Sequence, residues 1–109
     1  MSAEFKRKVF EKYSGRCSYC GNQITIDNMT VDHFTPKSKG GSLSIANCLP
    51  SCKRCNEIKA NGTIDEMRSK IEESLKSIRK NREYQTLKKY GLIETNQEPI
   101  VFFFEKESL

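Results

Sequence analysis

A chain of 109 residues is long enough for a single domain with a modest core, and we expect residues 1–109 to form one. Charged residues make up 30% of the sequence and the net charge is +5, which favours a polyanionic partner. No apolar run approaches the length of a membrane span and the N-terminus MSAEFKRKVF lacks the apolar segment of a signal peptide, so we expect a soluble, cytoplasmic protein without a membrane partner.

The first expected element is an N-terminal helix over residues 3–13. Phe5, Val9 and Tyr13 recur at helical spacing, and Gly15 follows where a helix commonly ends. An apolar stripe of this kind suits a core-facing surface better than a base-stacking surface. We therefore predict that this helix packs on the rest of the domain.

Two C-x2-C pairs follow, Cys17 with Cys20 and Cys52 with Cys55. A reducing compartment argues against a disulfide framework for the five cysteines. In each pair the two thiolates can bind the same metal ion from a single tight turn. The two pairs together then complete the four-thiolate shell of one structural Zn²⁺ site. Cys48 is left over, and we predict that it is a small buried residue.

Between the pairs the sequence predicts a hairpin and then a loop. Residues 24–26 and 29–31 are short β-prone runs on either side of Asp27-Asn28, a pair that suits a turn. A proline and a Gly-Gly pair indicate a loop over residues 34–46.

Helices are expected to dominate the remainder. The second cysteine pair opens a helix over 52–60, and Thr63 with Glu66 has the spacing of a capping box at the start of a helical extension over 63–90. The apolar residues of this extension form one stripe, which consists of Ile64, Met67, Ile71, Leu75 and Ile78. A β-prone tail over 99–105 is a candidate strand.

The segment VDHFTPKSKGG at residues 31–41 contains the single histidine of the chain. Together with CSYC before it and IANCLPSCKRCN after it, this segment resembles the HNH nuclease family in its four-cysteine, zinc-containing form. The likeness covers residues 17–59 and implies an α+β fold, the ββα-metal (His-Me finger) unit, with zinc stapling a small hairpin to a helix. One departure is Asn56, which replaces the histidine that ends the family signature. Asparagine is a common variant there and leaves the metal-binding role intact.

The same residues suit the hydrolysis of a phosphodiester. His33 in its neutral form can accept a proton from water, because a histidine has an unperturbed pKa near ~6.5. Asp32 and Asn56 offer oxygen ligands for Mg²⁺ or Mn²⁺, which would offset charge on the leaving oxygen. The two neighbouring side chains Asp32 and His33 diverge in a regular strand, so we expect the strand end to bend. The resemblance implies that the amide of Asn47 crosses the loop and orients His33.

Each of these residues has a simpler structural use. His33 could be an exposed loop residue, Asp32 could cap a turn, and Asn47 or Asn56 could be a local turn or helix-cap residue. Basic residues near the motif are candidates for phosphate contacts as a cluster, although a single lysine is more often only solvated. They are Lys37, Lys39, Lys53, Arg54 and Lys59.

Three functions are consistent with the sequence. The first is a metal-dependent endonuclease that cleaves DNA, or alternatively RNA, and leaves a 5′-phosphate and a 3′-hydroxyl. The second is a non-catalytic zinc module that binds nucleic acid, and the third is a module that binds a protein as an inhibitor or accessory factor. Asp32, His33 and Asn56 together favour the endonuclease, because neither alternative requires all three. The sequence leaves a homodimer or a protein partner open.

Overall fold

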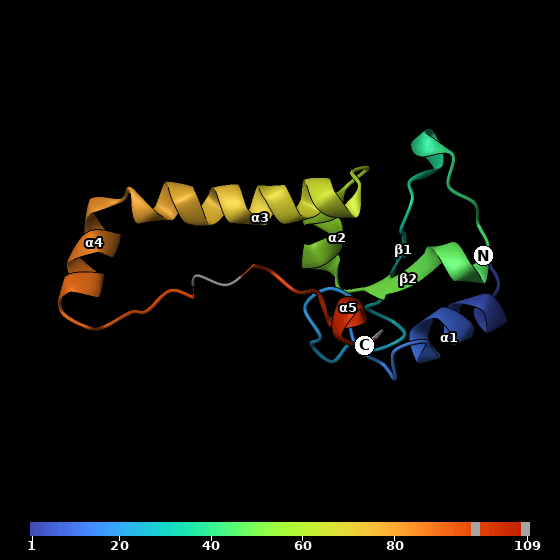
Figure 1. The fold of residues 1–109 in the computed structure, drawn as a ribbon. Helices are drawn as coiled ribbons and strands as arrows, with labels where there is room; N and C mark the ends of the chain where they lie inside the picture. Colours follow the sequence, from blue (N-terminus) through green and yellow to red (C-terminus); the bar gives the residue numbers. More distant parts are fainter. Residues whose placement is uncertain (97–98, 108–109) are drawn as a thin grey trace.

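A two-stranded antiparallel sheet and the helix that follows it form the centre of the structure, a computed structural model that describes residues 1–96 and 99–107 (Figure 1). The elements in chain order are α1 (Ala3–Glu11), β1 (Thr30–His33), η1 (Lys37–Lys39), η2 (Ile45–Asn47), β2 (Cys48–Ser51), α2 (Lys53–Lys59), α3 (Ile64–Arg79), α4 (Arg82–Lys89) and α5 (Phe103–Glu107). This arrangement of two strands, a helix and flanking helices is the α+β class that the sequence predicts.

The strand pairing corrects the predicted hairpin. β1 pairs with β2, with Thr30 opposite Ser51 and His33 opposite Cys48, so the partner strand lies beyond the loop and not at residues 24–26. Thr25 instead begins a turn, in which its backbone N–H donates to Asn28 Oδ1 at 2.8 Å and Asn28 N–H donates to Thr25 Oγ1 at 3.2 Å. These side chains satisfy the backbone locally, which removes the need for a strand partner.

The N-terminal helix packs on the sheet as expected. Ser2 caps α1 by accepting from the N–H of Phe5, and Val9 on its inner face is fully buried against Met29 and Cys48. Cys48 is therefore the small buried residue that the sequence predicts. Through this contact α1 and β2 form one packed unit.

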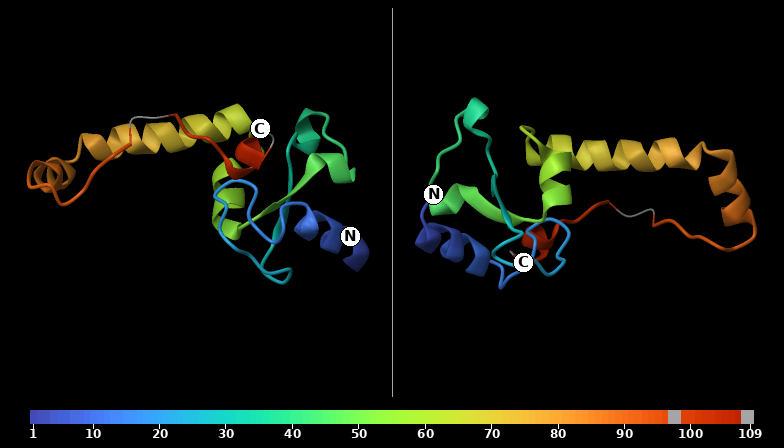
Figure 2. Two further views of the ribbon diagram at one scale, coloured as in Figure 1. Left: turned by 60° about the horizontal axis from the view of Figure 1, so that its bottom comes forward. Right: turned by 180° about the vertical axis from the view of Figure 1, so that it is seen from behind.

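An arm of two helices, residues 64–96, extends from this core (Figures 1 and 2). The predicted capping box of Thr63 and Glu66 is present at the start of α3, and Met67 in its first turns is fully buried. The helical extension is interrupted after α3, and Asn81 caps the start of α4, so the extension consists of two helices. The arm makes the molecule elongated, with extents of 51 × 28 × 27 Å. In the described part of the chain, every helix is too short or too polar to cross a bilayer.

The C-terminal tail returns along α3 and docks on the core, and the predicted strand over 99–105 is wrong. Residues 103–107 form α5, and the backbone N–H groups of Phe103 and Phe104 donate to the carbonyls of Tyr19 and Ser18 at 3.0 and 2.7 Å. The β-prone aromatic run is thus used for packing, since Phe102 and Phe104 both place their rings against Tyr19. Tertiary contact overrides β propensity here.

Arg68 on α3 anchors this tail. Its guanidinium donates to both carboxylate oxygens of Glu105, at 3.0 and 2.8 Å, and also to the carbonyl of Ile100. It lies 4.9 Å from the ring centroid of Phe102, a favourable cation–π geometry. The bidentate pair lowers the pKa of Glu105 below its usual range, because the Arg68 hydrogen bonds favour the charged carboxylate.

We expect Glu105→Gln to lower the midpoint of thermal unfolding at neutral pH by a few degrees, since a partly exposed pair contributes at most about 1 kcal/mol. A depressed folded pKa contributes stability above the unfolded glutamate pKa of about 4.3, and this is lost as pH falls through the folded value. The melting curves of parent and variant should therefore converge below about pH 4. A difference that persists unchanged at acid pH would contradict a role for the ion pair.

Candidate active site

Four cysteine sulfurs gather at the junction of the first turn and α2. The Sγ atoms of Cys17, Cys20, Cys52 and Cys55 all lie within 4.8 Å of one another. Cys52 is the N-cap of α2, where its sulfur accepts from the N–H of Cys55 at 3.3 Å. The spacing-based prediction of a four-cysteine cluster is confirmed.

The electrostatics of these thiols suit a bound divalent cation. Contact with the Cys55 thiol lowers the pKa of Cys17 to about 4, and the same contact raises the pKa of Cys55. Burial raises the pKa of Cys20. The cluster by itself thus favours one thiolate over four, because the negative charges repel at this distance. A four-coordinate Zn²⁺ removes that conflict, so the donor set fits structural zinc.

The turn that carries Cys17 and Cys20, here called the first zinc turn, is also hydrogen-bonded to β2, the strand that leads to Cys52. Ser18 donates to the carbonyl of Pro50 through its backbone N–H at 2.8 Å and through Oγ at 2.6 Å. Gly21 closes the turn with a positive φ of 78°, the left-handed conformation that glycine adopts without strain. The turn is thereby held beside β2 as well as by the sulfur cluster.

A cavity of about 430 Å³ lies between the end of β1 and α2. It brings together three of the four residues of the expected catalytic set, His33, Asp32 and Asn56, while Asn47 lies outside its lining. The remaining lining residues are Val31, Pro36, Lys37, Ser38, Ala60 and Asn61. Residues more than twenty positions apart thus meet in one hollow.

His33 is half-buried and lacks a partner for one ring nitrogen. Its Nε2 is buried and makes no hydrogen bond within the part of the chain that the structure describes. Its backbone carbonyl accepts from Lys59 Nζ at 2.8 Å. A buried ring nitrogen without a protein partner is the feature expected where water, an ion or a substrate oxygen completes the site.

Asp32 points to the inner side of β1 and is only 5% exposed. Its Oδ2 accepts a hydrogen bond from the Tyr19 hydroxyl and lies 3.1 Å from Lys59 Nζ. Among the described residues, no hydrogen bond reaches Oδ1. Burial, followed by the charge of Asp32, raises the pKa of Tyr19, which keeps the phenol protonated as a donor.

Lys59 was expected to contact phosphate, and this prediction is wrong. Its side chain is fully buried, and its ammonium group is satisfied by Asp32 and by the carbonyl of His33. Lys39 is also occupied, with Asn61 O at 3.0 Å and Glu66 Oε1 at 3.1 Å, and Arg54 lies 3.6 Å from Glu57. Lys37 and Lys53 are exposed, and Lys37 borders the cavity.

Asn47 closes the loop that follows His33. Its Oδ1 accepts from the N–H of Thr35 at 2.9 Å, and its Nδ2 donates to the carbonyls of Thr35 and Ser42 at 3.0 and 2.8 Å. Its backbone carbonyl accepts from Phe34 N–H at 2.8 Å. A Cβ on Gly41 would lie 1.7 Å from Thr35 O, so only glycine fits this crossing. The amide therefore crosses the loop as expected, although it bonds to the backbone beside His33 and not to the imidazole.

Sequence reasoning missed Tyr19 as a member of the site and assigned Lys59 to the wrong role. Tyr19 lies inside the first C-x2-C pair and Lys59 lies three positions after Asn56, on the next turn of α2. Both positions were visible as neighbours of motif residues. Their contact with Asp32 depends on tertiary packing and has no local signal.

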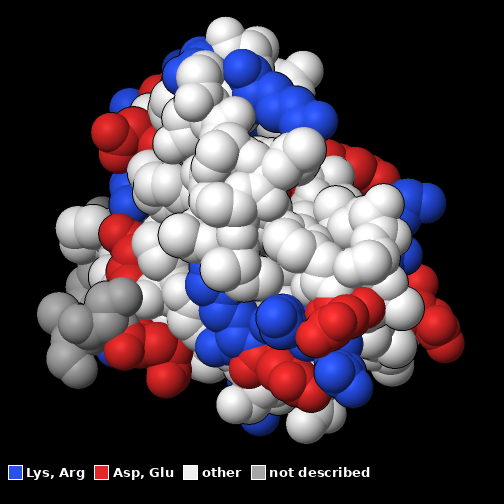
Figure 3. All heavy atoms as spheres, turned by 90° about the vertical axis from the view of Figure 1, so that its right-hand side faces the viewer, with Lys and Arg blue, Asp and Glu red and all other residues white. Residues whose placement is uncertain are grey.

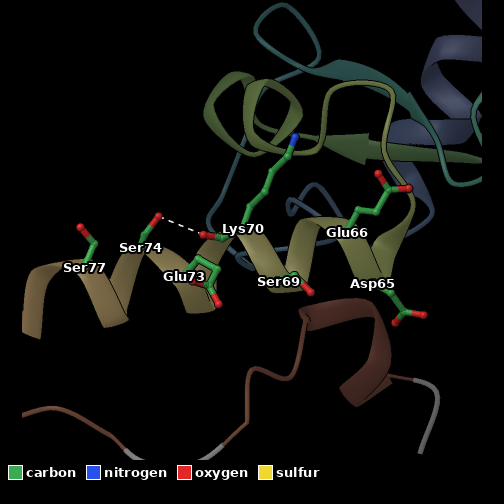
Figure 4. Close-up of a pocket in the computed structure, with 7 residues that line it drawn as sticks. All are labelled: Asp65, Glu66, Ser69, Lys70, Glu73, Ser74 and Ser77. Carbon is green, nitrogen blue, oxygen red and sulfur yellow. Dashed lines mark hydrogen bonds between the residues drawn. The ribbon is translucent and has the colours of Figure 1, made fainter.

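A larger hollow of about 820 Å³ runs along α3 and lies away from these residues (Figure 4). Its lining comes from α3 alone and consists of Asp65, Glu66, Ser69, Lys70, Glu73, Ser74 and Ser77. Lys70 reaches out of it to donate to the carbonyl of Ile58 at 2.9 Å. This open helix face has no convergent set of catalytic side chains, so we place the chemistry in the smaller cavity.

Replacing one cluster cysteine, as in Cys17→Ser or Cys55→Ser, should abolish zinc binding and cooperative thermal unfolding. The apparent binding free energy of a structural zinc site, ~10–16 kcal/mol, is comparable to the stability of a whole domain. Metal analysis and calorimetry measure the two effects. Cys48→Ser is the matched control and should retain zinc. A Cys17→Ser protein that melted like the parent would rule out structural zinc.

Comparison with known proteins agrees with this geometry. Residues 17–62 match the family described as HNH endonuclease. The CRISPR-associated endonuclease Cas9 of Corynebacterium diphtheriae is 36% identical over 52 residues, which are 47% of this chain and 5% of that protein. The Septu protein PtuB of Bacillus thuringiensis is 37% identical over 70 residues, 61% of this chain and 26% of that protein. This chain therefore spans a minor part of both relatives.

The crystal structure of the type II-C Cas9 enzyme from Actinomyces naeslundii has the same fold in one region. The TM-score is 0.55 with 23% sequence identity, over 87% of this chain and 12% of that chain. The match extends beyond the residues of the motif and includes flanking elements. The sequence match identifies residues 17–62 as an HNH endonuclease domain, and the four-cysteine cluster and the shared fold agree with that match.

Proposed function

We propose that this protein is a metal-dependent endonuclease that hydrolyses DNA phosphodiester bonds and leaves a 5′-phosphate and a 3′-hydroxyl. The observation that carries the proposal is the convergence of His33, Asp32 and Asn56 in one cavity within the HNH domain. The relative named an endonuclease supports the reaction class. Five cysteines without disulfides fit a reducing compartment, and we place the protein in the cytoplasm.

In this mechanism His33 accepts the proton of a water molecule that attacks phosphorus, the bond from phosphorus to the 3′ oxygen breaks, and the 3′ oxygen takes a proton from solvent water to become the hydroxyl. Asp32 and Asn56, which both border the cavity, would supply oxygen ligands for Mg²⁺ or Mn²⁺. When bound, the ion offsets negative charge on the phosphate and on the leaving oxygen. Asn47 and Gly41 keep the loop after His33 closed, which limits the positions that the imidazole can adopt.

His33→Ala should lower the single-turnover cleavage rate by roughly 10²- to 10⁴-fold, because it removes proton abstraction in the transition state. Fold, zinc content and DNA affinity should stay close to those of the parent. Asp32→Ala and Asn56→Ala should instead raise the concentration of Mg²⁺ or Mn²⁺ needed for half-maximal cleavage. Nicking of supercoiled plasmid measures all three.

A His33→Ala protein that cut at the parental rate, free of contaminating nuclease, would remove His33 from the mechanism. If the parent cut neither DNA nor RNA with any divalent metal, the function would revert to a zinc module that binds nucleic acid. One site cuts one strand, so a monomer should produce nicks. Double-strand breaks at low protein concentration would indicate a homodimer or a protein partner.

We further propose that the end of the arm binds the DNA backbone. Residues 76–90 hold six lysines and arginines and one glutamate, so their net charge of +5 equals that of the whole chain. At the end of the core that faces away from α4, basic and acidic side chains lie side by side (Figure 3). The charge surplus is thus concentrated at the end of the arm, residues 76–90, where it can attract a phosphate backbone. Arg68 and Lys70 lie before this segment and are engaged within the protein. Within the segment Lys76 pairs with Glu73 and Arg79 donates to the carbonyl of Asn96, so the test uses the exposed Lys80 and Arg82.

The double variant Lys80→Gln with Arg82→Gln should weaken DNA binding and reduce the slope of log K against log salt by about 1 for each phosphate that the arm no longer neutralises. The single-turnover rate at saturating DNA should be unchanged. Lys6→Gln with Arg7→Gln removes the same charge from exposed positions of α1 and is the matched control. Equal salt slopes for the two double variants would show that the arm does not bind DNA.

A further inference from the structure

We propose that Tyr19 and Lys59 are positioning residues that hold the Asp32 carboxylate by Oδ2, so that Oδ1 is presented to the divalent ion of the cavity. This inference rests on the proposed function and gives a role in it to two residues outside the set of His33, Asp32, Asn47 and Asn56. Because Tyr19 lies between the zinc ligands Cys17 and Cys20, the structural zinc site would also set the geometry of the catalytic metal site.

The three groups form a closed cluster that water scarcely reaches. Lys59 is fully buried, Tyr19 is 3% exposed and Asp32 is 5% exposed. Tyr19 Oη donates to Oδ2, and Lys59 Nζ lies 3.1 Å from the same oxygen. A buried carboxylate and a buried ammonium are tolerated only with such partners. Here both partners of the carboxylate, Tyr19 and Lys59, contact the same oxygen, Oδ2. Asp32 also lines the cavity, and its other oxygen, Oδ1, is the one that these two partners leave available to a ligand there.

Lys59 ties this cluster to both other members of the site. Its Nζ also donates to the carbonyl of His33 at 2.8 Å, so one ammonium group restrains the strand end that carries His33 and the carboxylate before it. Lys59 is on α2, three residues after Asn56. The helix that supplies the proposed amide ligand therefore also supplies the cation that aligns the proposed carboxylate ligand.

Tyr19 is itself held rigidly. The rings of Phe102 and Phe104 meet its ring edge-on, with centroids 5.7 and 6.0 Å away, and its backbone carbonyl accepts from Phe103 N–H at 3.0 Å. The C-terminal tail thus packs over the tyrosine ring. A fixed ring gives the hydroxyl one position, which is the requirement for orienting a metal ligand.

The test compares Tyr19→Phe with Tyr84→Phe in the full-length, zinc-loaded protein. Tyr84 is also buried and its hydroxyl donates to Thr95 Oγ1 at 3.0 Å, but it lies on the arm, so its variant controls for the loss of a buried phenol hydroxyl. Binding of Mn²⁺ alone is measured by electron paramagnetic resonance of the free ion. Zinc content and the melting midpoint are recorded for each variant, and Asp32→Asn defines binding that does not depend on the carboxylate.

We expect Tyr19→Phe to raise the Kd for Mn²⁺ by about 10-fold or more, as is typical when a partner of a metal ligand is removed. Zinc content should be unchanged and Tyr84→Phe should bind Mn²⁺ like the parent. In the Asp32→Asn background, adding Tyr19→Phe should have no further effect on Mn²⁺ binding, because the hydroxyl acts through the carboxylate. Lys59→Met, which keeps the length of the side chain, should weaken Mn²⁺ binding in the same direction.

Parental Mn²⁺ affinity in Tyr19→Phe, with only the melting midpoint lowered, would overturn the inference and leave the proposed endonuclease intact. Equal loss of affinity in Tyr84→Phe would also overturn it, since the effect would then be a general loss of stability. If the parent and Asp32→Asn bound Mn²⁺ equally, Asp32 would not be a metal ligand. That result would overturn both this inference and the metal-binding part of the proposed function.

Discussion

The clustering of four cysteine sulfurs, which as thiolates would repel one another, is the constraint on which the rest of the structure depends. Two four-residue strands and a seven-residue helix bury too little apolar surface to be stable alone. A cation shared by the four sulfurs turns the repulsion into a cross-link between the first turn and the start of α2. Both sides of the candidate site are attached to that cross-link, Tyr19 to the turn and Asn56 to the helix.

Asp32 is where the requirements of folding and of chemistry meet. A buried ion pair contributes little net stability, because desolvation of both charges offsets their attraction. Tyr19 and Lys59 both bind Oδ2 of a residue that also lines the cavity, and under the proposed function this pairing orients the carboxylate so that Oδ1 is available to the ion. Side chains alternate along a strand, so Asp32 and His33 point in different directions, and the site makes use of both directions. One side chain reaches inward to the cluster while the next remains at the cavity wall.

The tail supports the core, whereas the arm is the proposed site of DNA binding. The tail contributes aromatic surface and two backbone hydrogen bonds to the first zinc turn, and Arg68 anchors it to α3. The end of the arm carries a net charge equal to that of the whole chain. A basic surface away from the cavity can bind a polyanion without competing with the charged groups of the cavity for the same phosphate.

The sequence by itself determined the four clustered cysteines, the capping box of α3, the burial of Val9 and Cys48, and the candidate residues that line the cavity. Each depends on spacing, local hydrogen bonding or periodicity, which a linear pattern records. Only the tertiary structure decided that β1 pairs with β2 across the loop, that the tail forms α5, and that Lys59 turns inward. Strand partners, docking sites and the direction of a long side chain depend on what else is close in space. An exposed lysine and a buried lysine that pairs with Asp32 have the same local sequence, and they differ only in the fold around them.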